Sequence, residues 1–503
     1  MYAIGVDSGT QGAKILVVHA ETGEVVGRGG APHAMAEGLK PGESEQHPSV
    51  WIAAFEKALS EALGRSGIQP AEIVALGVSG QQHGFVPIDR EGRPIRPAKL
   101  WNDTSTIAET EELVAALGGP VSYIEKVGIG LAVGFTASKI LWLKRHEPAH
   151  FARLATVFLP HNYLNYYLTG SAHMEYGDAS GTGLMDVRRR VWQSEAVAAV
   201  DRGLGHKLPP LDHPREPVGY VRKSVASSFG MAKVLVSAGG GDNMMGAIGS
   251  GNVVPGVCTV SLGTSGTVYS FFDRPFSDPA GEIAAFCDST GGWLPLLCTM
   301  NVTNTTELFR AMHRIGNAEL EALAARASAG SDGLVFLPFI DGERVPVLPA
   351  ASGSFFGLTR RNFGASAMAR SIMEGTIFNL GYGFGRMKEL GLVPKEIRAT
   401  GGGARSRLWL QIVADILGTP VVTLQEPEAA AFGAALQSIW TYRRENGESA
   451  GIEEIAGRMV NKADLAAEPD PRNSELYQGL QARFNSLWKT LAPEFKAHRA
   501  FLS

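Results

Sequence analysis

The sequence has few cysteines and no excess of positive charge, and each of these absences excludes a class of protein. Its only cysteines, Cys258, Cys287 and Cys298, lie in apolar stretches without a C-x-x-C spacing, so we expect neither a disulfide framework nor a zinc site. The 46 basic and 50 acidic side chains leave a net charge of -4, without the basic excess that binding to a phosphate backbone requires. Nucleic acid is therefore not an expected partner.

Long apolar runs are also missing. No segment reaches the roughly 18 apolar residues of a membrane-spanning helix. The amino terminus, MYAIGVDSGT, enters a strand pattern at once, without the charged and apolar regions of a signal peptide. We therefore expect a cytoplasmic protein with no membrane partner. With 503 residues, 45% of them hydrophobic and 19% charged, the chain is long enough for two or three domains and too apolar for disorder.

Two common nucleotide-binding signatures are absent as well. No G-x-x-x-x-G-K-[ST] segment occurs, and no G-x-G-x-x-G segment follows the first strand, so any nucleotide site is neither a Walker-type P-loop nor a dinucleotide fold. What the chain does have is glycine, 61 residues or about 12% against an average near 7%. These glycines gather in short runs after apolar stretches, a pattern in which backbone N-H groups can point at a phosphate.

The two halves of the chain repeat one pattern. Residues 2–30 predict an antiparallel meander of three strands. An amphipathic helix with Trp51, Phe55, Leu59 and Leu63 along one face follows, and then a strand over 73–80. A similar series of strands starts at residue 256. The turn G-T-x-G occurs at Gly9–Gly12 and again at Gly263–Gly266, an offset of 254 residues. A repeat this long predicts two duplicated α/β domains, residues 1–250 and 251–503, rather than a solenoid.

A second pair of glycine runs closes a strand in each half. Ala238–Asp242 (AGGGD) follows VLVS, and Gly401–Arg405 (GGGAR) follows EIRAT, each before an expected helix. Together with the two G-T-x-G turns, they imply a cleft between the domains in which backbone amides meet a phosphate. Only the first run ends in a carboxylate, so we expect chemistry there and binding of a flat adenine ring at the second.

The first turn places Asp7 at a strand end, a tight turn after it and Lys14 beyond. One interpretation is that the turn holds phosphate oxygens and Asp7 a hydrated Mg²⁺; the other is an ordinary hairpin turn of the D-S-G-T kind. The duplicated turn favours phosphate binding, because two hairpins that face each other across a cleft can hold the β- and γ-phosphates together.

Asp242 is the candidate catalyst. As general base it would accept the proton of a sugar hydroxyl that attacks the γ-phosphorus; the alternative is a helix N-cap, a position that favours Asp. Polar groups also end the strand before Gln81–Gly84 and follow in Leu100–Asp103, as a polyol site would need. The alternatives there are a structural histidine at His83 and a core tryptophan at Trp101.

The sequence resembles a known family, the FGGY carbohydrate kinases, whose fold is shared by actin, sugar kinases and heat-shock ATPases. The resemblance runs along nearly the whole chain. It is carried by IGVDSGTQGAK, GVSGQQHG, LWND, GFTASKILWLKRHEP, DASGTGLMDV, SAGGGDN, SLGTSG, FLPFIDGER and TGGGARSRLWLQIVADILG. It implies an α/β fold of two duplicated actin-like (ribonuclease H-like) domains, with a nucleotide and sugar cleft between them.

The resemblance also implies an activity and its site residues. It is strongest to the members that use ATP and Mg²⁺ to phosphorylate the 5-hydroxyl of D-xylulose. Matched motif by motif, Asp242 takes the role of the catalytic aspartate and Asp7, with Asp242, that of the metal-associated pair. The other implied contacts are Thr10, Gln11, Lys14, Gly263, Thr264 and Ser265 for the phosphates, Gly402, Gly403, Ala404 and Arg405 for the adenine, and Gln82, His83, Trp101, Asp103, Asp242 and Asn243 for the sugar.

Some positions depart from that branch of the family. Gln11 stands where Ser is usual and Gln82 where Met is common, while Asn301–Leu308 and Val345–Leu348 also differ. The acceptor therefore stays open between D-xylulose and another ketose, alditol or sugar acid such as ribulose, gluconate or glycerol. A chaperone-like or filament-forming ATPase of the same fold is the alternative from another class. A homodimer also stays open, because one sequence does not show the oligomeric state.

Overall fold

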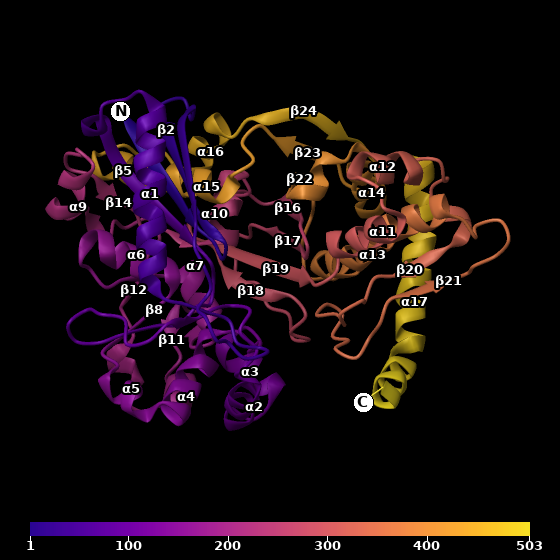
Figure 1. The fold of residues 1–503 in the computed structure, drawn as a ribbon, viewed down its shortest axis with the longest axis horizontal. Helices are drawn as coiled ribbons and strands as arrows, with labels where there is room; N and C mark the ends of the chain where they lie inside the picture. The colour runs from indigo at the N-terminus through magenta and orange to yellow at the C-terminus, as the bar shows by residue number, and fades with distance from the viewer. Residues whose placement is uncertain (503) are drawn as a thin grey trace.

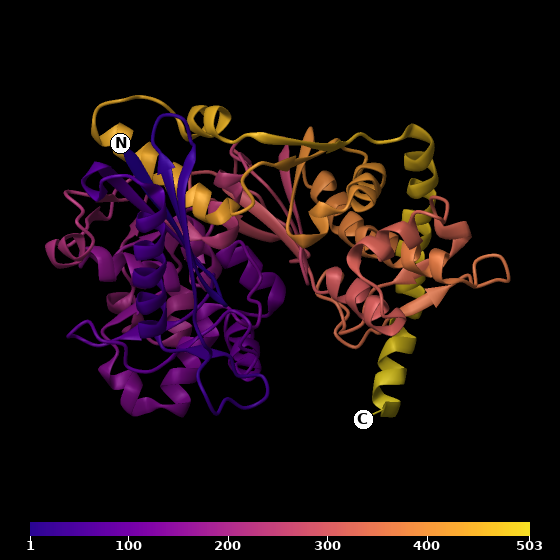
Figure 2. The same ribbon diagram turned by 45° about the horizontal axis from the view of Figure 1, so that its top comes forward.

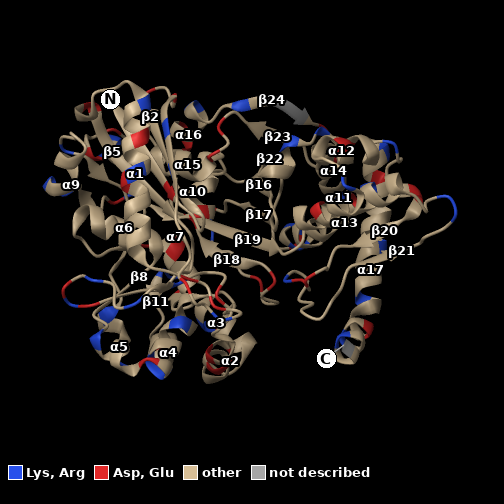
Figure 3. Ribbon diagram, in the orientation of Figure 1, with Lys and Arg blue, Asp and Glu red and all other residues tan. Residues whose placement is uncertain are grey.

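The computed structural model describes residues 1–502, including all their side chains except those of residues 464–466 and 502. Two lobes lie side by side, each built around a seven-stranded sheet (Figure 1). The first sheet comes from the first half of the chain and the second sheet from the second half. Acidic and basic residues are interspersed over both lobes (Figure 3).

The first sheet has the strand order β13-β14-β5-β1-β2-β3, and β15 pairs with β5 beyond the end of β14. The strands β1, β2 and β3 form the antiparallel meander that the sequence predicts, and β5 returns parallel to β1. The strand bounds are β1 Tyr2–Ser8, β2 Gly12–His19, β3 Val25–Pro32, β5 Ile73–Gly80, β13 Gly219–Tyr220, β14 Leu235–Val236 and β15 Gly240–Gly241.

The second sheet repeats this arrangement, with the order β18-β19-β17-β16-β22-β23-β24. Here β16 and β17 form the antiparallel hairpin, and β22 returns parallel to β16 as β5 does to β1. The strand bounds are β16 Val257–Leu262, β17 Gly266–Ser270, β18 Ala284–Cys287, β19 Trp293–Thr299, β22 Glu396–Thr400, β23 Val421–Leu424 and β24 Lys462–Ala467. The predicted duplication of an α/β unit is therefore confirmed.

Helices cover both sheets. The helix α1, Pro48–Ser66, packs on the first sheet through Trp51, Phe55 and Leu59, which are buried at the spacing that the sequence predicts. Leu63, on the same helix, is only half-buried. In the other lobe, α13 (Ala365–Glu389) packs against β17, β19 and β20 (Val335–Leu337), so each sheet has a long helix on one face.

Two helices pack closely at the junction of the lobes. The helix α15, Ala429–Glu445, comes from the second half of the chain but packs on β1 and β5 of the first sheet (Figure 2). It crosses α10, Asp242–Gly249, so closely that a Cβ at Gly249 would lie 1.8 Å from the carbonyl oxygen of Ala429. The second half of the chain thus contributes a helix to the first lobe, and the domain boundary near residue 250 stays a prediction.

The remaining helices lie around the two sheets. Where the sequence left the end of the chain unplaced, β24 adds an edge strand to the second sheet and α17 packs against α13 and α14. None of the described helices combines the length and apolarity that a membrane span requires. The bounds of the others used below are α4 Thr136–His146, α6 Pro160–Thr169, α7 Tyr176–Ala179, α14 Arg407–Leu417 and α17 Pro471–Leu502.

Candidate active site

Asp7 lies where β1 and β5 end together. In this parallel pair Asp7 is opposite Ser79, whose hydroxyl donates a hydrogen bond of 2.9 Å to Asp7 Oδ1. Burial raises the pKa of Asp7 to about 6, against the lowering effects of Ser79 and of the nearby Lys14 ammonium. The sheet therefore presents a half-buried carboxylate at its carboxyl-terminal edge, where ligands bind to open α/β sheets.

Asp242 is the first residue of α10, and Gly241 is the N-cap of that helix. The alternative that Asp242 is an N-cap is therefore wrong. Its Oδ1 accepts hydrogen bonds from the backbone N-H of Asn243 at 2.8 Å and from Asn243 Nδ2 at 3.0 Å. Burial, the charge on Asp7 and that on Asp178 together raise the pKa of Asp242 to about 7. A carboxylate with this pKa is suited to accept a proton near neutral pH.

The predicted sugar contacts Gln82 and Asn243 touch each other. Asn243 Nδ2 donates to Gln82 Oε1 at 2.8 Å, and Gln82 Nε2 donates to the sulfur of Met244 at 3.2 Å. The segment that follows β5 is thereby joined to the start of α10. Asp242, Asn243 and Gln82 form one contiguous polar group, as the family resemblance implies.

His83 has the left-handed backbone conformation, with φ of 61°, which non-glycine residues seldom adopt. Its carbonyl oxygen accepts hydrogen bonds from Lys139 Nζ at 2.7 Å and from Thr136 Oγ1 at 3.2 Å, both on α4. Burial lowers the pKa of Lys139 to about 7. These two donors hold His83 in its strained conformation.

The ring of His83 lies between two phenylalanines. Its centroid is 4.5 Å from that of Phe135 and 5.6 Å from that of Phe286, which belongs to the second half of the chain. Burial, Lys139 and Arg344 lower the pKa of His83 to about 3, so the imidazole is neutral at physiological pH. This packing makes His83 a rigid, uncharged group at the junction of the lobes.

Trp101 and Asp103 lie on one turn but in different environments. Trp101 is 40% exposed and donates from Nε1 to Thr10 Oγ1 at 2.9 Å. The alternative that it belongs to the core is therefore wrong. Asp103 is fully buried, and its carboxylate accepts hydrogen bonds from the backbone N-H of Ser44 at 2.9 Å and from Lys99 at 3.2 Å. The structure thus brings Trp101, but not Asp103, to the surface beside the first turn.

The first turn is held by neighbours as well. Thr10 Oγ1 donates to Gln81 Oε1 at 3.1 Å, and the carbonyl of Gln11 accepts from the backbone N-H of His33. Lys14 is paired with Glu428 at 2.6 Å on the surface, although the sequence suggests it as a phosphate ligand. The bond to Glu428 uses one of the three donors of the Lys14 ammonium.

The glycine elements of the second half meet each other. The turn between β16 and β17 closes through a bond from Gly263 N to Ser265 O, and Thr264 accepts from the backbone of Val302. The run Gly401–Arg405 lies directly beside β16, since a Cβ at Gly403 would lie 2.8 Å from the Cβ of Leu262. Gly402, by contrast, has no atom within 4 Å of a Cβ position. Its surface is open to a ligand.

Two of the segments that depart from the family pattern, Asn301–Leu308 and Val345–Leu348, meet at Glu343, whose backbone N-H and C=O are paired with those of Leu348. The buried carboxylate of Glu343 accepts hydrogen bonds from the backbone N-H of Met300 at 2.7 Å and from Asn301 Nδ2 at 3.2 Å. Asn379 Nδ2 donates to the same group at 2.9 Å. Asn301 also donates to the carbonyl of Gly342. These departures therefore adjoin the second turn through Val302.

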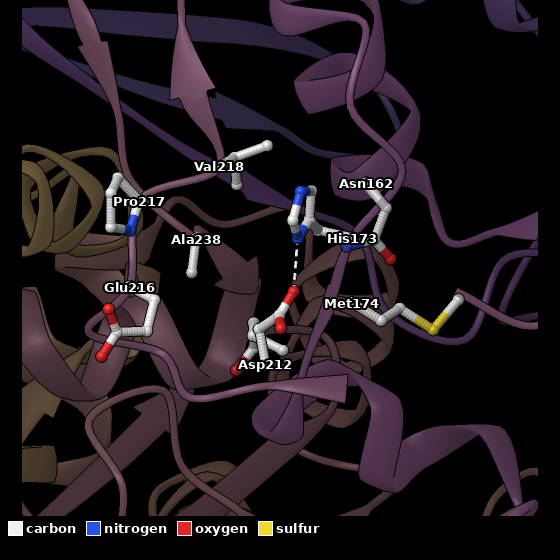
Figure 4. A pocket seen from close by; sticks show the side chains of 9 residues that line it. Asn162, His173, Met174, Asp212, Glu216, Pro217, Val218 and Ala238 are labelled. Carbon is white, nitrogen blue, oxygen red and sulfur yellow. Dashed lines mark hydrogen bonds and ion pairs between the residues drawn. The ribbon is translucent and has the colours of Figure 1, made fainter. Parts of the chain in front are cut away.

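A cavity of about 90 Å³ lies beside Ala238, at the start of the first glycine run (Figure 4). His173 and Asp212 are hydrogen-bonded to each other in its wall. The other lining residues are Asn162, Met174, Glu175, Glu216, Pro217, Val218 and Ala238. None of the predicted site residues lines this cavity, so it is not the cleft that the sequence predicts.

Several groups at the site were not identified from the sequence. Ser79, Phe135, Lys139 and Phe286 contact the predicted residues directly, and a Cβ at Gly181 would lie 2.2 Å from His83 Nδ1. The motifs GFTASK and DASGTG contain three of these five positions. Both motifs contribute to the family resemblance, but only the fold shows that their residues surround His83.

The acidic pair fits a hard divalent cation. Asp7 and Asp242 are half-buried carboxylates whose pKa values are raised mainly by burial, and the charge on Asp7 raises that of Asp242 further. No cluster of three or more His, Cys, Asp or Glu suited to a metal occurs among the described residues. Mg²⁺ commonly binds through one or two carboxylates, with water and substrate phosphates completing its shell. Two half-buried carboxylates, one of them just before the first turn, match that requirement.

Comparison with known proteins shows the class to which this chain belongs. Residues 2–249 match the N-terminal domain of the FGGY family of carbohydrate kinases, and residues 259–442 match its C-terminal domain. The chain belongs to this family and is a carbohydrate kinase.

Relatives that are similar to this chain carry the name xylulose kinase. The chain is 42% identical to a xylulose kinase from Haemophilus influenzae over 88% of this chain and 91% of the relative. It is 34% identical to a xylulose kinase from Escherichia coli, with 97% and 99% covered. The crystal structure of a xyloylose kinase from Brucella ovis superposes with a TM-score of 0.90 at 31% identity, covering 98% of this chain and 99% of that one.

Proposed function

We propose that this protein transfers the γ-phosphoryl group of ATP to the 5-hydroxyl of D-xylulose, giving D-xylulose 5-phosphate and ADP. The relatives at 42% and 34% identity that carry the name xylulose kinase support the choice of sugar. The observation that carries the chemistry is the Asp242 carboxylate, whose pKa is raised to about 7 and which is hydrogen-bonded to Asn243 beside Gln82.

Asp242 serves as general base in this proposal. As the sugar oxygen forms its bond to the γ-phosphorus, its proton passes to a carboxylate oxygen of Asp242, and the bond from the γ-phosphorus to the bridging oxygen of ADP breaks. The hydrogen bonds from Asn243 hold the carboxylate in one orientation. Orientation matters because a proton acceptor must lie within hydrogen-bond reach of the hydroxyl.

The residues of the sugar site in the proposal are Gln82, His83, Trp101, Asp103 and Asn243. Four of these, all but Asp103, lie around the start of α10 and the first turn. The buried carboxylate of Asp103 would stabilise the turn that presents Trp101. His83 is neutral and fixed between two rings. A rigid, uncharged donor suits a polyol, whose hydroxyls offer both donors and acceptors.

The nucleotide is assigned to the turns of both halves. Thr10, Gln11 and Lys14 from the first turn and Gly263, Thr264 and Ser265 from the second would hold the phosphates, and Gly402, Gly403, Ala404 and Arg405 the adenine. Asp7 and Asp242 would hold Mg²⁺, which when bound offsets the charge on the phosphoryl oxygens. The open surface over Gly402 supports the adenine assignment.

A coupled assay of ADP release tests the proposal. Mg-ATP is offered with D-xylulose, L-xylulose, D-ribulose, L-ribulose, D-gluconate, glycerol and common alditols, and with no sugar. We expect D-xylulose to give the dominant rate. Turnover of another acceptor without D-xylulose would overturn the choice of sugar, and ADP release without any sugar would favour an ATPase role. The cytoplasmic location and a homodimer stay predictions.

A further inference from the structure

The loop that carries Asp242 is held by one side chain from the far end of the chain. Gln437, on α15, is fully buried. Its Oε1 accepts from Gly239 N at 2.8 Å and from Ser237 Oγ at 2.9 Å. Its Nε2 donates to Gly239 O at 3.1 Å and to Ser289 O at 3.0 Å. The amide therefore uses two donors and two acceptor positions, its full capacity.

Gly239 needs an outside partner because the sheet gives it none. It lies between β14 and β15 with φ of 72°, and a Cβ there would lie 2.4 Å from the carbonyl oxygen of Val78. The turn takes its N-H and C=O out of the strand ladder, and buried backbone groups must be paired. Gln437 pairs both and so takes the place of a neighbouring strand.

The same amide reaches the other lobe. Ser289 lies in the turn between β18 and β19 of the second sheet, and its Oγ donates to Glu175 Oε2 at 3.0 Å. A Cβ at Gly240 would lie 2.3 Å from that Oγ. The glycine run before Asp242 is thus enclosed between α15 and the Ser289 turn.

From this geometry we infer that Gln437 is a positioning residue for phosphoryl transfer, fixing the Gly239–Asp242 loop against the Ser289 turn so that Asp242 meets the sugar hydroxyl. The inference rests on the proposed role of Asp242. Gln437 touches neither the sugar nor the nucleotide in this assignment. It acts through the backbone of Gly239, three residues before the base.

The first test replaces Gln437 by Met, which has similar length but forms none of the four hydrogen bonds. Since misplacing a catalytic group by about 1 Å can cost about 100-fold in rate, we expect kcat with D-xylulose to fall by about 10- to 100-fold. The Kd of D-xylulose, measured by calorimetry without ATP, should change by less than about threefold. Lys139, Thr136 and the two phenylalanines still place His83.

The matched control is Ser438→Ala. Ser438 is equally buried on the same helix, but its hydroxyl donates only to the carbonyl of Ala435 within the helix. Its loss should leave kcat unchanged. Wild-type kcat in the Met variant, or an equal loss of kcat in the Ser438 control, would overturn the inference.

A Gln437→Glu variant supplies a test that does not depend on the folding of the Met variant. The introduced carboxyl keeps the shape, and in its neutral form its O-H donates to one of the two carbonyl oxygens. Burial favours the neutral form, so kcat relative to wild type should be higher near pH 6 than near pH 8. Glu175 is the ionisable group among the described side chains that are hydrogen-bonded to Ser237, Gly239 or Ser289. Dividing the kcat of the variant by the kcat of wild type at each pH corrects for any effect of Glu175.

A ratio that does not change with pH would overturn the inference. The Asp242→Asn variant, assayed alongside, keeps the two ideas distinguishable. Normal turnover in that variant would remove the role of Asp242 as base, whereas the Gln437 variants report on whether the loop must be held in place.

Discussion

The two halves of this kinase have a similar arrangement of strands but differ in the side chains at the ends of those strands. In the first half, Asp7 lies one residue before the end of β1 and accepts a hydrogen bond from Ser79, which is opposite it on β5. At the equivalent place in the second half, β16 has Ser261 opposite Thr400 on β22. The first turn closes through Gly9 N to Gly12 O, and the second one residue sooner, through Gly263 N to Ser265 O.

The glycine runs differ in the same sense. Gly239–Gly241 lead to the carboxylate of Asp242 and are covered by Val78, Ser289 and Gln82. Gly401–Gly403 lead to Ala404, and Gly402 faces open space. The two halves thus repeat one framework but present different groups at the ends of their glycine runs. Under the proposed function, the first half supplies charged groups for the chemistry and the second half supplies backbone surface for binding.

The largest effect should follow from Asp242→Asn. The amide keeps the size of the side chain but accepts a proton far less readily, so kcat should fall by about 100- to 10,000-fold, the usual contribution of a general base. Calorimetry should show that D-xylulose still binds, and circular dichroism that the fold is kept. Near-normal turnover would mean that the first half does not hold the base, and the comparison would lose its main support.

A smaller effect should separate the two turns. Asp7→Asn removes a charge that would hold Mg²⁺, so we expect kcat to fall by about 10- to 100-fold with a higher Mg²⁺ requirement. Its matched variant, Ser261→Ala, should stay within about threefold of wild type, because Ser261 is half-buried and its hydroxyl carries no charge that could hold Mg²⁺. The measurement is kcat against total Mg²⁺ for both. Equal losses would show that the two turns share the chemistry.

The glycine runs offer a third contrast. At Gly402 an added methyl enters open space, so Gly402→Ala should leave the melting temperature unchanged and raise the KM for ATP by about 3- to 10-fold if adenine lies there. At Gly240 the methyl would lie 2.3 Å from Ser289 Oγ and 2.7 Å from the Cε of Met245. Gly240→Ala should therefore cost about 1–3 kcal/mol of stability, as overpacking does. An unchanged KM for ATP in the Gly402 variant would argue against the adenine assignment.

Much of this organisation could be predicted from the sequence, because it is local. The meander of β1 to β3, the buried face of α1 and the repeated G-T-x-G turns follow from periodicity and turn residues over a few positions. The same reasoning placed Asp242 after a glycine run, where the structure shows it as the first residue of α10.

What could not be predicted depends on partners that are distant in the chain. Lys14 meets Glu428, 414 residues away, and Gly239 meets Gln437 across 198 residues. No spacing in one sequence reveals such pairs. The polar segment Leu100–Asp103 and the family resemblance predict Asp103 as a sugar contact, whereas hydrogen bonds from Lys99 and Ser44 hold its carboxylate in a buried position. The left-handed backbone of His83 is likewise set by Lys139 and Thr136 from α4.

The smallest expected effect concerns the stability of the first half, which keeps an ammonium group buried behind His83. Burial lowers the pKa of Lys139 from 10.5 to about 7. Below about pH 7 both the folded and the unfolded chain carry the proton, and the folded state bears the full cost of the buried charge. Between about pH 7 and 10.5 the folded chain releases the proton while the unfolded chain keeps it. The free energy of unfolding therefore gains a positive contribution as pH rises, at most about 1.4 kcal/mol per pH unit.

Urea denaturation of wild type and of Lys139→Met from about pH 7 to about pH 9 measures this contribution as the difference between the two curves. The variant lacks the titrating amine, so its stability relative to wild type should fall as pH rises. Other ionisable groups, Glu175 among them, affect both proteins equally and cancel. Parallel curves would show that Lys139 keeps its charge in the folded protein. The backbone of His83 would then be held by a charged ammonium, compensated by Asp103, the nearby carboxylate that raises the pKa of Lys139. The burial of this charge in the first half would then cost less stability than the lowered pKa implies.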